Sequence, residues 1–328
     1  MSGHTSSPAR GKAGSSAPSE GGGPVIGLDL GGTKIAASLV GADGTVLTRH
    51  TRPTPAGEGA EKVLDALAEA ARAADPQDVA AAVGVAAAGV IDPVRGVVTS
   101  ATDALPGWAG TRLADGLSSR LGSPVACDND VRAAAYPELL AAGPDASLLY
   151  AAVGTGIGGA VAADGRMLHG AGGLAGHLGH LASPEAEGLP CTCGSTGHLE
   201  AVASGPAITA LYRRRSGRTA TRLEEVAGRA ADGDRQARDA IVTGARATGR
   251  ILGGLANTLA PHRVVVGGGV PRIGRLYQDA LADAFTAELM APLHGLLPTA
   301  PLSGPDAAVL GAVHLVRILP LHHPGAHQ

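Results

Sequence analysis

Three glycine-rich turns in this chain follow apolar runs, and each could hold a phosphate group. The turn residues are Gly31, Gly32, Thr33 and Lys34 in the first turn, Gly154, Thr155, Gly156 and Gly158 in the second, and Gly267, Gly268 and Gly269 in the third. Glycine has no Cβ, so backbone N–H groups in such turns can approach a phosphate closely. Asp29 ends the first apolar run, where its carboxylate could hold Mg²⁺ directly or through water. One such turn could be an ordinary hairpin, whereas three predict a nucleotide held along its phosphates and base.

The surroundings of these turns differ from those of the common nucleotide motifs. The Walker pattern G-x-x-x-x-G-K-[ST], which leads into a helix, is absent at the first turn. An apolar strand follows the second turn, where the G-x-G-x-x-G fingerprint requires a helix. A further hairpin turn signal at 41–44 follows the second apolar run, which indicates that the first turn joins two strands of a hairpin. The turns at 31–33 and 154–159 therefore each join two strands of a hairpin, and this repetition predicts two similar halves.

Asp130 is the candidate general base. It belongs to Asp128-Asn129-Asp130, where a strand expected at 125–127 meets a helix expected at 132–140. A carboxylate at this junction could accept the proton of an attacking hydroxyl group, and the amide of Asn129 could hold sugar hydroxyls. Helix capping would explain either residue taken alone, because Asn and Asp are favoured at helix starts. The three phosphate-binding turns favour the catalytic role for Asp130.

A cluster of histidine and cysteine residues predicts a metal site. The two imidazoles and two thiolates of this set suit tetrahedral zinc, and they belong to His180, Cys191, Cys193 and His198. Four protein ligands leave no open position for water, so we expect a structural ion that fixes the loop carrying His177 and Glu200. A chance grouping of Cys and His in a loop is the alternative. His169 and His262 lie outside the pattern, and we expect them at the surface or in the core.

The elements that must position these residues alternate between strands and helices, which is typical of an α/β fold. Strands are expected on both sides of the turns at 31–33 and 154–159, before the third turn, and at 79–85 and 125–127. A further hairpin is expected at 89–98. Helices are expected at 60–74, 113–121, 132–140, 197–212, 222–231, 234–259 and 306–319.

Composition excludes several classes of protein. The chain has 328 residues, 45% of them hydrophobic, which is enough for one large or two moderate domains. A net charge of −3 gives no reason to expect nucleic acid or a membrane surface as a partner. Three cysteines, two of them one residue apart, make a poor disulfide framework, so we expect a reducing cytoplasm. The segments 1–24 and 321–328 are expected to be disordered tails, and the first lacks the apolar region of a signal peptide.

Together these motifs resemble the ROK family, which groups repressors, open reading frames and sugar kinases, over about residues 24–320. The matching stretches are 28–34, 128–130, 154–159, 173–180 and 191–200, with 257–261 and 264–269 on the adenosine side. The resemblance implies an ATP-dependent kinase acting on the 6-hydroxyl of a hexose or N-acetylhexosamine. It also implies a homodimer of chains with two actin-like (ribonuclease H-like) domains and an interdomain cleft. These domains would span 25–132 plus 307–320, and 133–306 with the zinc loop.

The resemblance carries residue roles onto matching positions. It implies that Asp130 is the base, that Asn129 and Glu200 contact the sugar, and that His180 is both a zinc ligand and a sugar contact. The last zinc ligand is commonly Cys in the family and is His198 here, which zinc also accepts. An Asn that usually precedes a Leu-Pro-Gly-Trp segment is missing, and Asp103 is expected to make its sugar contact instead.

The most useful departure from the family pattern is His177, because most members have Glu there. The stretch 173–180 is similar to that of the bacterial branch that phosphorylates N-acetylmannosamine. A neutral imidazole has one donor nitrogen, which the carbonyl of an N-acetyl group needs, whereas a carboxylate only accepts. We therefore expect transfer of phosphate from ATP to O6 of N-acetylmannosamine, with glucose or another N-acetylhexosamine as the alternative substrate.

Two other classes of function remain as alternatives. A sugar-sensing repressor of the family would carry an N-terminal DNA-binding domain, for which the segment before Asp29 is expected to be too short. A catalytically inactive sugar-binding protein would need neither Asp130 nor three phosphate-binding turns, so these residues favour the enzyme.

Overall fold

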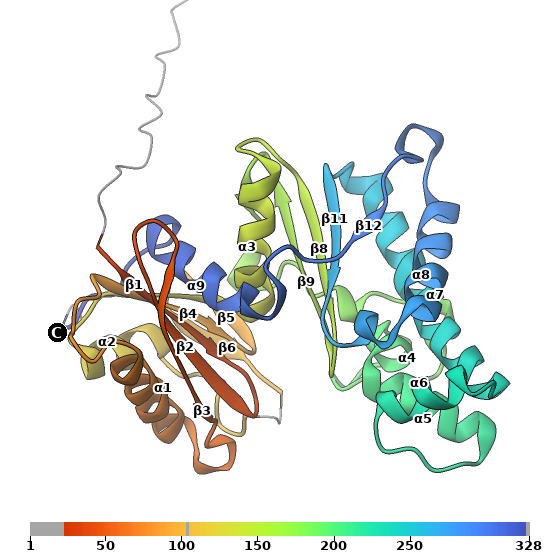
Figure 1. Ribbon diagram of the computed structural model, residues 1–328, viewed down its shortest axis with the longest axis horizontal. Helices are drawn as coiled ribbons and strands as arrows, with labels where there is room; N and C mark the ends of the chain where they lie inside the picture. Colours follow the sequence, from red (N-terminus) through yellow and green to blue (C-terminus); the bar gives the residue numbers. More distant parts are fainter. Residues whose placement is uncertain (1–22, 103–104, 326–328) are drawn as a thin grey trace, which may run out of the picture.

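The described part of the chain forms two α/β halves, each built on a five-stranded mixed sheet (Figure 1). The computed structural model describes residues 23–102 and 105–325. The first sheet has the strand order β3-β2-β1-β4-β7, and the second has the order β10-β9-β8-β11-β12. In each sheet the first hairpin is antiparallel and its first strand pairs in parallel with the next strand inward. The repeated order confirms the two similar halves predicted from the paired glycine-rich turns.

The elements of the first half surround the first sheet. Its strands are β1 (Val25–Leu30), β2 (Lys34–Val40), β3 (Val46–Pro53), β4 (Ala82–Ala87) and β7 (Val125–Asn129), with a separate hairpin of β5 (Val90–Asp92) and β6 (Val97–Ser100). Its helices are α1 (Ala60–Ala74), α2 (Leu113–Leu121) and α9 (Ala307–Ile318). The bounds of α1 and α2 agree with those expected from the sequence.

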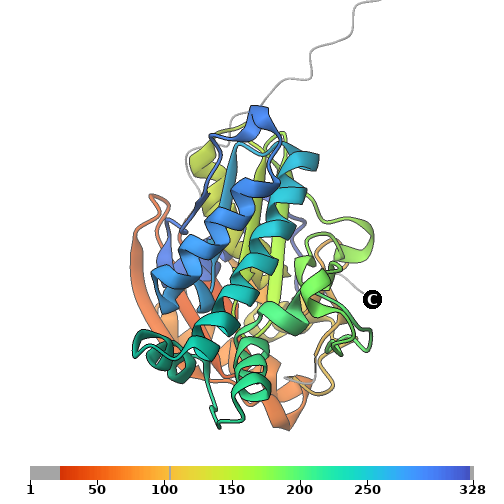
Figure 2. The same cartoon turned by 90° about the vertical axis from the view of Figure 1, so that its right-hand side faces the viewer.

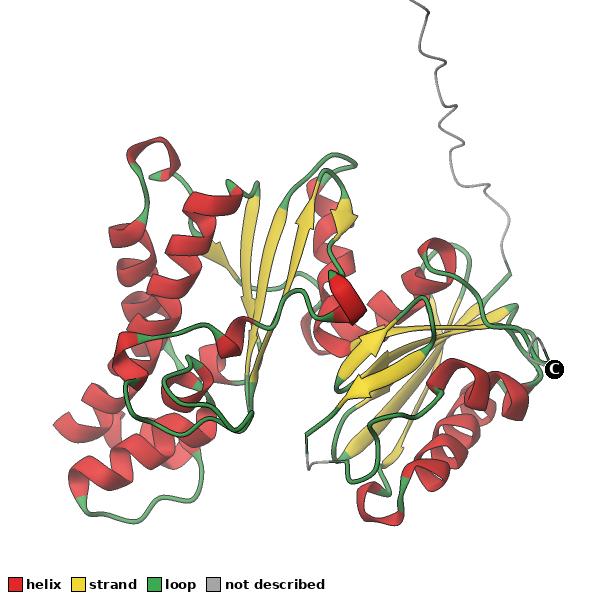
Figure 3. Ribbon diagram, turned by 180° about the vertical axis from the view of Figure 1, so that it is seen from behind, coloured by secondary structure: helices red, strands yellow, loops and turns green. Residues whose placement is uncertain are grey.

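The second half contains most of the helices. Its strands are β8 (Leu148–Val153), β9 (Ile157–Ala163), β10 (Arg166–Met167), β11 (Arg263–Gly267) and β12 (Pro298–Thr299). Its α-helices are α3 (Asp130–Ala142), α4 (Glu200–Ala203), α5 (Gly205–Ser216), α6 (Leu223–Ala231), α7 (Arg235–Leu259) and α8 (Arg275–Glu288). Two 3-10 turns matter below, η2 (Ala171–Gly173) and η3 (Leu178–His180). Figure 3 shows helices on both faces of each sheet.

Alternation along β1 explains how the first sheet is covered. Ile26, Leu28 and Leu30 point to one face and share a buried cluster with residues of α1 and α2. Gly27 faces α9 on the other side, where a Cβ would lie 2.4 Å from the carbonyl oxygen of Val309. The glycine therefore lets α9 lie directly against the sheet.

Helices α3 and α9 lie between the two sheets and join the halves (Figure 1). A Cβ on Gly311 of α9 would lie 1.7 Å from the carbonyl oxygen of Ala133 on α3, so the two helices are in close contact. One buried cluster includes Ala86 and Ala126 of the first sheet and Tyr150 of the second. The base candidate at the start of α3 is thus held by a core that both halves share.

The sequence predicted the outer helical layer incompletely. The helices α7 and α8 lie side by side on the outer face of the second half (Figure 2), yet no helix was expected from the sequence at the position of α8. The helix expected at 197–212 is two helices, because the chain turns at Ser204. The side chain of Ser204 accepts a hydrogen bond from the backbone N–H of Ala207 and starts α5 as its N-cap.

The end of the described chain corrects a second expectation, that of a disordered tail over 321–328. His322 exchanges two backbone hydrogen bonds with Val125, over 2.8 and 3.0 Å, and its Nδ1 lies 3.1 Å from Oδ1 of Asp115. Residues 1–22 and 326–328 lie outside the described part. Within the described residues, no helix combines the length and apolar character needed to cross a membrane.

Candidate active site

The first and second glycine-rich turns close antiparallel hairpins, as the sequence predicted. In the first, the N–H of Gly31 donates to the carbonyl oxygen of Lys34 over 3.0 Å, and Thr54 braces the turn through a 2.7 Å bond to the carbonyl oxygen of Gly31. In the second, the N–H of Gly154 donates to the carbonyl oxygen of Gly156 over 2.9 Å. The first turn thus joins β1 to β2, and the second joins β8 to β9.

The third turn lies against the second. Gly268 has a φ of +93°, and a Cβ there would lie 2.2 Å from the carbonyl oxygen of Val153, at the end of β8. Only glycine allows this approach. The structure therefore brings together the second and third turns, which the sequence assigned to the phosphates and the adenosine side of a nucleotide.

Asp130 lies between the first and second turns. Its neighbour Val131 packs on the second turn, where a Cβ on Gly158 would lie 2.7 Å from Cγ2 of Val131. Burial, reinforced by the negative charge of Asp29 from the first hairpin, raises the pKa of Asp130 to about 7. A carboxyl group with this pKa can accept a proton near neutral pH.

Asp29 carries a second perturbed carboxylate. Burial raises the pKa of Asp29 to about 6, and the positive charge of Lys34 partly opposes that effect. Among the described residues, the Asp29 side chain makes no hydrogen bond. Two half-buried carboxylates with raised pKa values therefore face one region between the turns, which is typical of catalytic or cation-binding sites.

Asn129 is the residue that caps α3. Its Oδ1 accepts from the N–H groups of Val131 and Arg132 over 3.0 and 3.2 Å, and its Nδ2 donates to Gly89 and to Oδ1 of Asp130. The capping alternative raised for the Asp128-Asn129-Asp130 stretch is thus fulfilled by Asn129. In this arrangement the amide oxygen and nitrogen are both used in hydrogen bonds within the protein.

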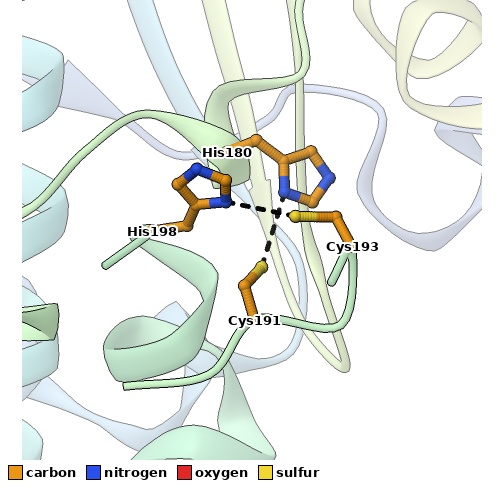
Figure 4. Close-up of side chains that lie close together, drawn as sticks. All are labelled: His180, Cys191, Cys193 and His198. Carbon is orange, nitrogen blue, oxygen red and sulfur yellow. Dashed lines mark hydrogen bonds between the residues drawn. The ribbon is translucent and has the colours of Figure 1, made fainter. Parts of the chain in front are cut away.

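His180, Cys191, Cys193 and His198 converge on one point (Figure 4). One donor atom from each lies within 4.8 Å of all the others. Nδ1 of His180 lies 3.6 Å from Sγ of Cys191, and Nδ1 of His198 lies 3.2 Å from Sγ of Cys193. Two thiol sulfurs and two imidazole nitrogens at this spacing form a cluster that could hold a metal ion.

Glu200 connects this cluster to the second turn. Its Oε2 accepts from the N–H of Ile157 over 2.8 Å, and its Oε1 accepts from the hydroxyl of Thr192 over 2.6 Å. A Cβ on Gly156 would lie 2.7 Å from Oε2, so the carboxylate packs directly on the turn. A cavity of about 400 Å³ opens here, and Thr155, Thr192 and Glu200 are among its lining residues.

His177 lies two residues beyond Ala175, just before η3, with its ring nearly parallel to that of His180 at a centroid distance of 6.2 Å. Its Nδ1 lies 2.9 Å from the carbonyl oxygen of Leu174. A carbonyl oxygen only accepts, so Nδ1 carries the hydrogen and the Nε2 of a neutral ring is an acceptor. The donor role expected for the neutral ring does not fit this arrangement. Nε2 can instead accept from the N–H of an N-acetyl group or from a sugar hydroxyl.

The remaining candidates fall in three groups. Asp103 lies outside the described residues, although Trp108 shortly after it is buried and donates from Nε1 to the carbonyl oxygen of Ala88. His262 is a structural residue whose Nδ1 accepts from the N–H of Ser147. Arg132 was not singled out from the sequence, and His169 was expected at the surface or in the core, yet both contact Asp128 beside the base.

The spacing of Asp128 and Arg132, four residues apart across the start of α3, could have indicated an ion pair. Nothing in the sequence indicated the contact of Asp128 with His169, because 41 residues separate the two.

Comparison with known proteins gives a consistent answer. The profile of the ROK family matches residues 25–318. An N-acetylmannosamine kinase from Shigella flexneri is 36% identical over 295 residues, which cover 89% of this chain and 98% of that protein. The solved structure of a ROK hexokinase from Thermus thermophilus is 36% identical, with a TM-score of 0.78 and coverage of 89% and 97%.

A ROK family glucokinase from Streptomyces griseus, solved in complex with glucose and AMPPNP, is 32% identical with a TM-score of 0.76. The alignment covers 90% of this chain and 99% of the glucokinase. The two repeated halves are therefore the actin-like, two-domain α/β fold that the sequence resemblance implied. On the family profile and on identities above 30% over nearly the whole length, the chain belongs to the ROK family.

Proposed function

We propose that this sugar kinase transfers the γ-phosphoryl group of ATP to O6 of N-acetylmannosamine, giving N-acetylmannosamine 6-phosphate and ADP. The observation that supports N-acetylmannosamine as the substrate is the 36% identity to N-acetylmannosamine kinases over 98% of their length. Glucose is the second candidate, because the Streptomyces griseus glucokinase is 32% identical and was solved with glucose.

Asp130 is the proposed base. Its Oδ1 accepts from the N–H of Val131 and from Nδ2 of Asn129, so Oδ2 is the oxygen that would take the proton of O6. A pKa of about 7 leaves a large fraction ionised at neutral pH while keeping the oxygen basic. The backbone N–H groups of the turns at 31–33 and 154–159 would stabilise charge on the transferring phosphoryl group.

The carboxylate of Asp29 fits a magnesium ion. It is an oxygen donor, it makes no hydrogen bond within the described residues, and burial disfavours its charge unless a cation is near. When bound with ATP, Mg²⁺ would supply positive charge that offsets the charge of the phosphate groups. Lys34 follows the first turn and lowers the pKa of Asp29, so it contributes positive charge on the same side.

A structural zinc ion is the proposed occupant of the Cys/His cluster. The donor set of two thiolates and two imidazoles fits zinc, and four protein ligands leave no position for a reacting water. The ligands lie on either side of Thr192 and end just before Glu200, so they would fix the part of the loop that contacts the second turn.

The sugar contacts remain proposals residue by residue. We assign them to Asn129, His177, His180, Glu200 and Asp103. His177 would accept through Nε2 from the N-acetyl N–H or a hydroxyl, with its Nδ1 fixed on Leu174. We further propose a homodimer in the cytoplasm, with ATP and the sugar as small-molecule partners and no role in binding nucleic acid or membrane.

The test is ADP release with Mg·ATP across N-acetylmannosamine, N-acetylglucosamine, glucose and mannose. The expected result is a preference for N-acetylmannosamine, with phosphate on C6 by NMR of the product and a kcat lowered by about 10²–10⁴ in Asp130→Asn. A preference for glucose would replace the substrate and keep the base. If the protein binds ATP but phosphorylates none of these sugars, a catalytically inactive sugar-binding protein would be favoured.

A further inference from the structure

A buried ionic cluster of Asp128, Arg132 and His169 lies beside the proposed base. The side chains of Asp128 and Arg132 are 0% and 1% exposed. Nε of Arg132 donates to Oδ1 of Asp128 over 2.7 Å, and Nε2 of His169 lies 2.8 Å from Oδ2. Carboxylate oxygens accept, so His169 donates through Nε2. Both oxygens of this buried carboxylate thus receive charged or polar donors from the protein.

The guanidinium of Arg132 also binds two other segments. One terminal nitrogen donates to the carbonyl oxygens of Gly173 and Ala175 over 2.8 and 3.2 Å, and the other donates to that of Ile91 over 3.1 Å. Ile91 lies in β5 of the first half, whereas Gly173 and Ala175 belong to the loop that leads to His177. A single planar group therefore joins three segments.

Independent packing holds the same loop in place. Gly173 has a φ of +79°, and a Cβ there would lie 2.0 Å from the carbonyl oxygen of Ile91. The loop from the second half is thus in direct backbone contact with a strand of the first half. Only glycine permits the approach that brings the carbonyl of residue 173 within reach of Arg132.

We propose that Arg132 is a positioning residue that fixes the loop 169–177, and with it His177, against the helical turn that carries Asp130. His169 completes the arrangement by holding the second oxygen of Asp128. A buried ion pair gains little net stability, because desolvation offsets its attraction. What the planar fork of Arg supplies is geometry, since its donors have fixed directions.

The kinetic consequence of this inference rests on the proposed function. If His177 contacts the sugar, a loop held against the helical turn that carries Asp130 keeps the bound sugar correctly positioned relative to this base. The nucleotide is expected to contact mainly the turns at 154–159 and 267–269, which Arg132 does not touch. Loss of the arginine fork should therefore weaken sugar binding selectively.

The first test uses Arg132→Lys, which keeps a positive charge beside Asp128 but loses the fork. We expect the KM for the sugar to rise about tenfold, as for the loss of one or two hydrogen bonds, while the KM for ATP stays unchanged. The matched control is Arg120→Lys, because Arg120 on α2 also contacts a carboxylate and a backbone carbonyl, those of Asp65 and Gly116. This control should leave both KM values unchanged.

A conservative pair of variants separates the role of His169 from a loss of packing. The side-chain amide of His169→Gln can place a donor where Nε2 lies, whereas His169→Leu cannot. We expect His169→Gln to keep the KM for the sugar near that of the unaltered protein and His169→Leu to raise it. An equal rise in both variants would overturn the part assigned to His169.

A readout that needs no turnover keeps this inference separate from the proposed function. Backbone amides of 170–177 should exchange with deuterium faster in Arg132→Lys than in the unaltered protein, and at the same rate in Arg120→Lys. Unchanged exchange in Arg132→Lys, or an equal rise in both KM values, would overturn the proposal. If the unaltered protein phosphorylates no sugar, the proposed function fails. The exchange measurement still shows whether Arg132 fixes the loop 169–177.

Discussion

The two glycine-rich hairpins have the same backbone plan, but only the first has a carboxylate in one of its own strands. In β1, Asp29 stands two residues before Gly31, whereas in β8 the corresponding residue before Gly154 is Ala152. A carboxylate does reach the second turn, but it comes from Glu200 on another element and binds the N–H of Ile157.

This difference separates two uses of a buried carboxylate. Both carboxylate oxygens of Glu200 accept hydrogen bonds, from Ile157 and Thr192, so this side chain strengthens the second turn as a rigid support. Asp29 has no such bonds among the described residues, and its pKa is raised to about 6. A half-buried carboxylate without hydrogen bonds costs stability, and its position beside Asp130 points to the first hairpin as the side where charge takes part in the reaction.

The largest expected effect comes from Asp130→Asn, which keeps the shape of the side chain and removes the base. We expect kcat to fall by about 10²–10⁴, the usual contribution of a general base. The far-ultraviolet circular dichroism spectrum should be unchanged. A kcat within a factor of a few of the unaltered enzyme would show that another group takes the proton.

The second prediction concerns the support of the second turn. In Cys191→Ser we expect less than one zinc per chain by elemental analysis and a loss of activity of about a hundredfold, because the loop that carries Thr192 and Glu200 loses its metal. Cys127→Ala is the control, since this buried cysteine of β7 lies outside the cluster and should leave the zinc content intact. Full activity of metal-free protein would separate the cluster from the active site.

The third prediction tests the charge of the first hairpin. In Asp29→Asn the negative charge that helps to raise the pKa of Asp130 is gone, so that pKa should fall. The rate needs ionised Asp130, so the acidic limb of the profile of kcat/KM against pH, near 7 in the unaltered enzyme, should move to lower pH. Weaker binding of Mg²⁺ should lower the maximal rate about tenfold. A limb that stays in place would show that Asp29 does not act on the base.

The same variant predicts a change in stability. The pKa of Asp29 is raised from 3.8 to about 6, so the folded protein binds its proton more tightly than the unfolded chain does. The free energy of unfolding should therefore rise as the pH falls from about 6 towards 4. At pH 8 the ionised Asp29 carboxylate lowers the stability of the folded protein. Asp29→Asn removes that cost and should stabilise the protein at pH 8 by roughly 1–3 kcal/mol. Urea unfolding at pH 5 and pH 8 measures the effect, which should be smaller at pH 5.

Local patterns predicted much of this site. The hairpin turns, the start of α3 near Asp130 and the Cys/His set all depend on residues close in sequence, where the physics of turns, caps and metal donors decides the outcome. The helix expected over 197–212 was wrong in the middle because Ser204, a good N-cap, starts a second helix there. The helix α8 was not predicted, although its contact with Gly249 of α7, where a Cβ would lie 2.3 Å from the carbonyl oxygen of Leu281, fixes it in the fold.

Contacts between distant segments could not be predicted from the sequence. The bonds of Arg132 to Ile91 and Gly173 join residues about 41 positions apart on either side, and they exist only once the two halves have packed together. The tautomer of His177 depends on one backbone carbonyl, that of Leu174. The donor role expected for a neutral His177 ring does not fit this hydrogen bond, and side-chain chemistry alone does not say which nitrogen the backbone uses.

The smallest expected effect is that of Glu200→Gln, and it separates the two uses of a carboxylate most sharply. The amide oxygen of Gln can still accept from the N–H of Ile157, and its nitrogen can donate to the hydroxyl of Thr192, so the second turn should keep its shape. If Glu200 only supports the turn, kcat and both KM values should stay within about threefold of the unaltered enzyme. A rise confined to the KM for the sugar would instead support the direct sugar contact proposed for Glu200. Both carboxylates would then take part in binding, and they would differ in what they bind: Glu200 the sugar and Asp29 the magnesium ion.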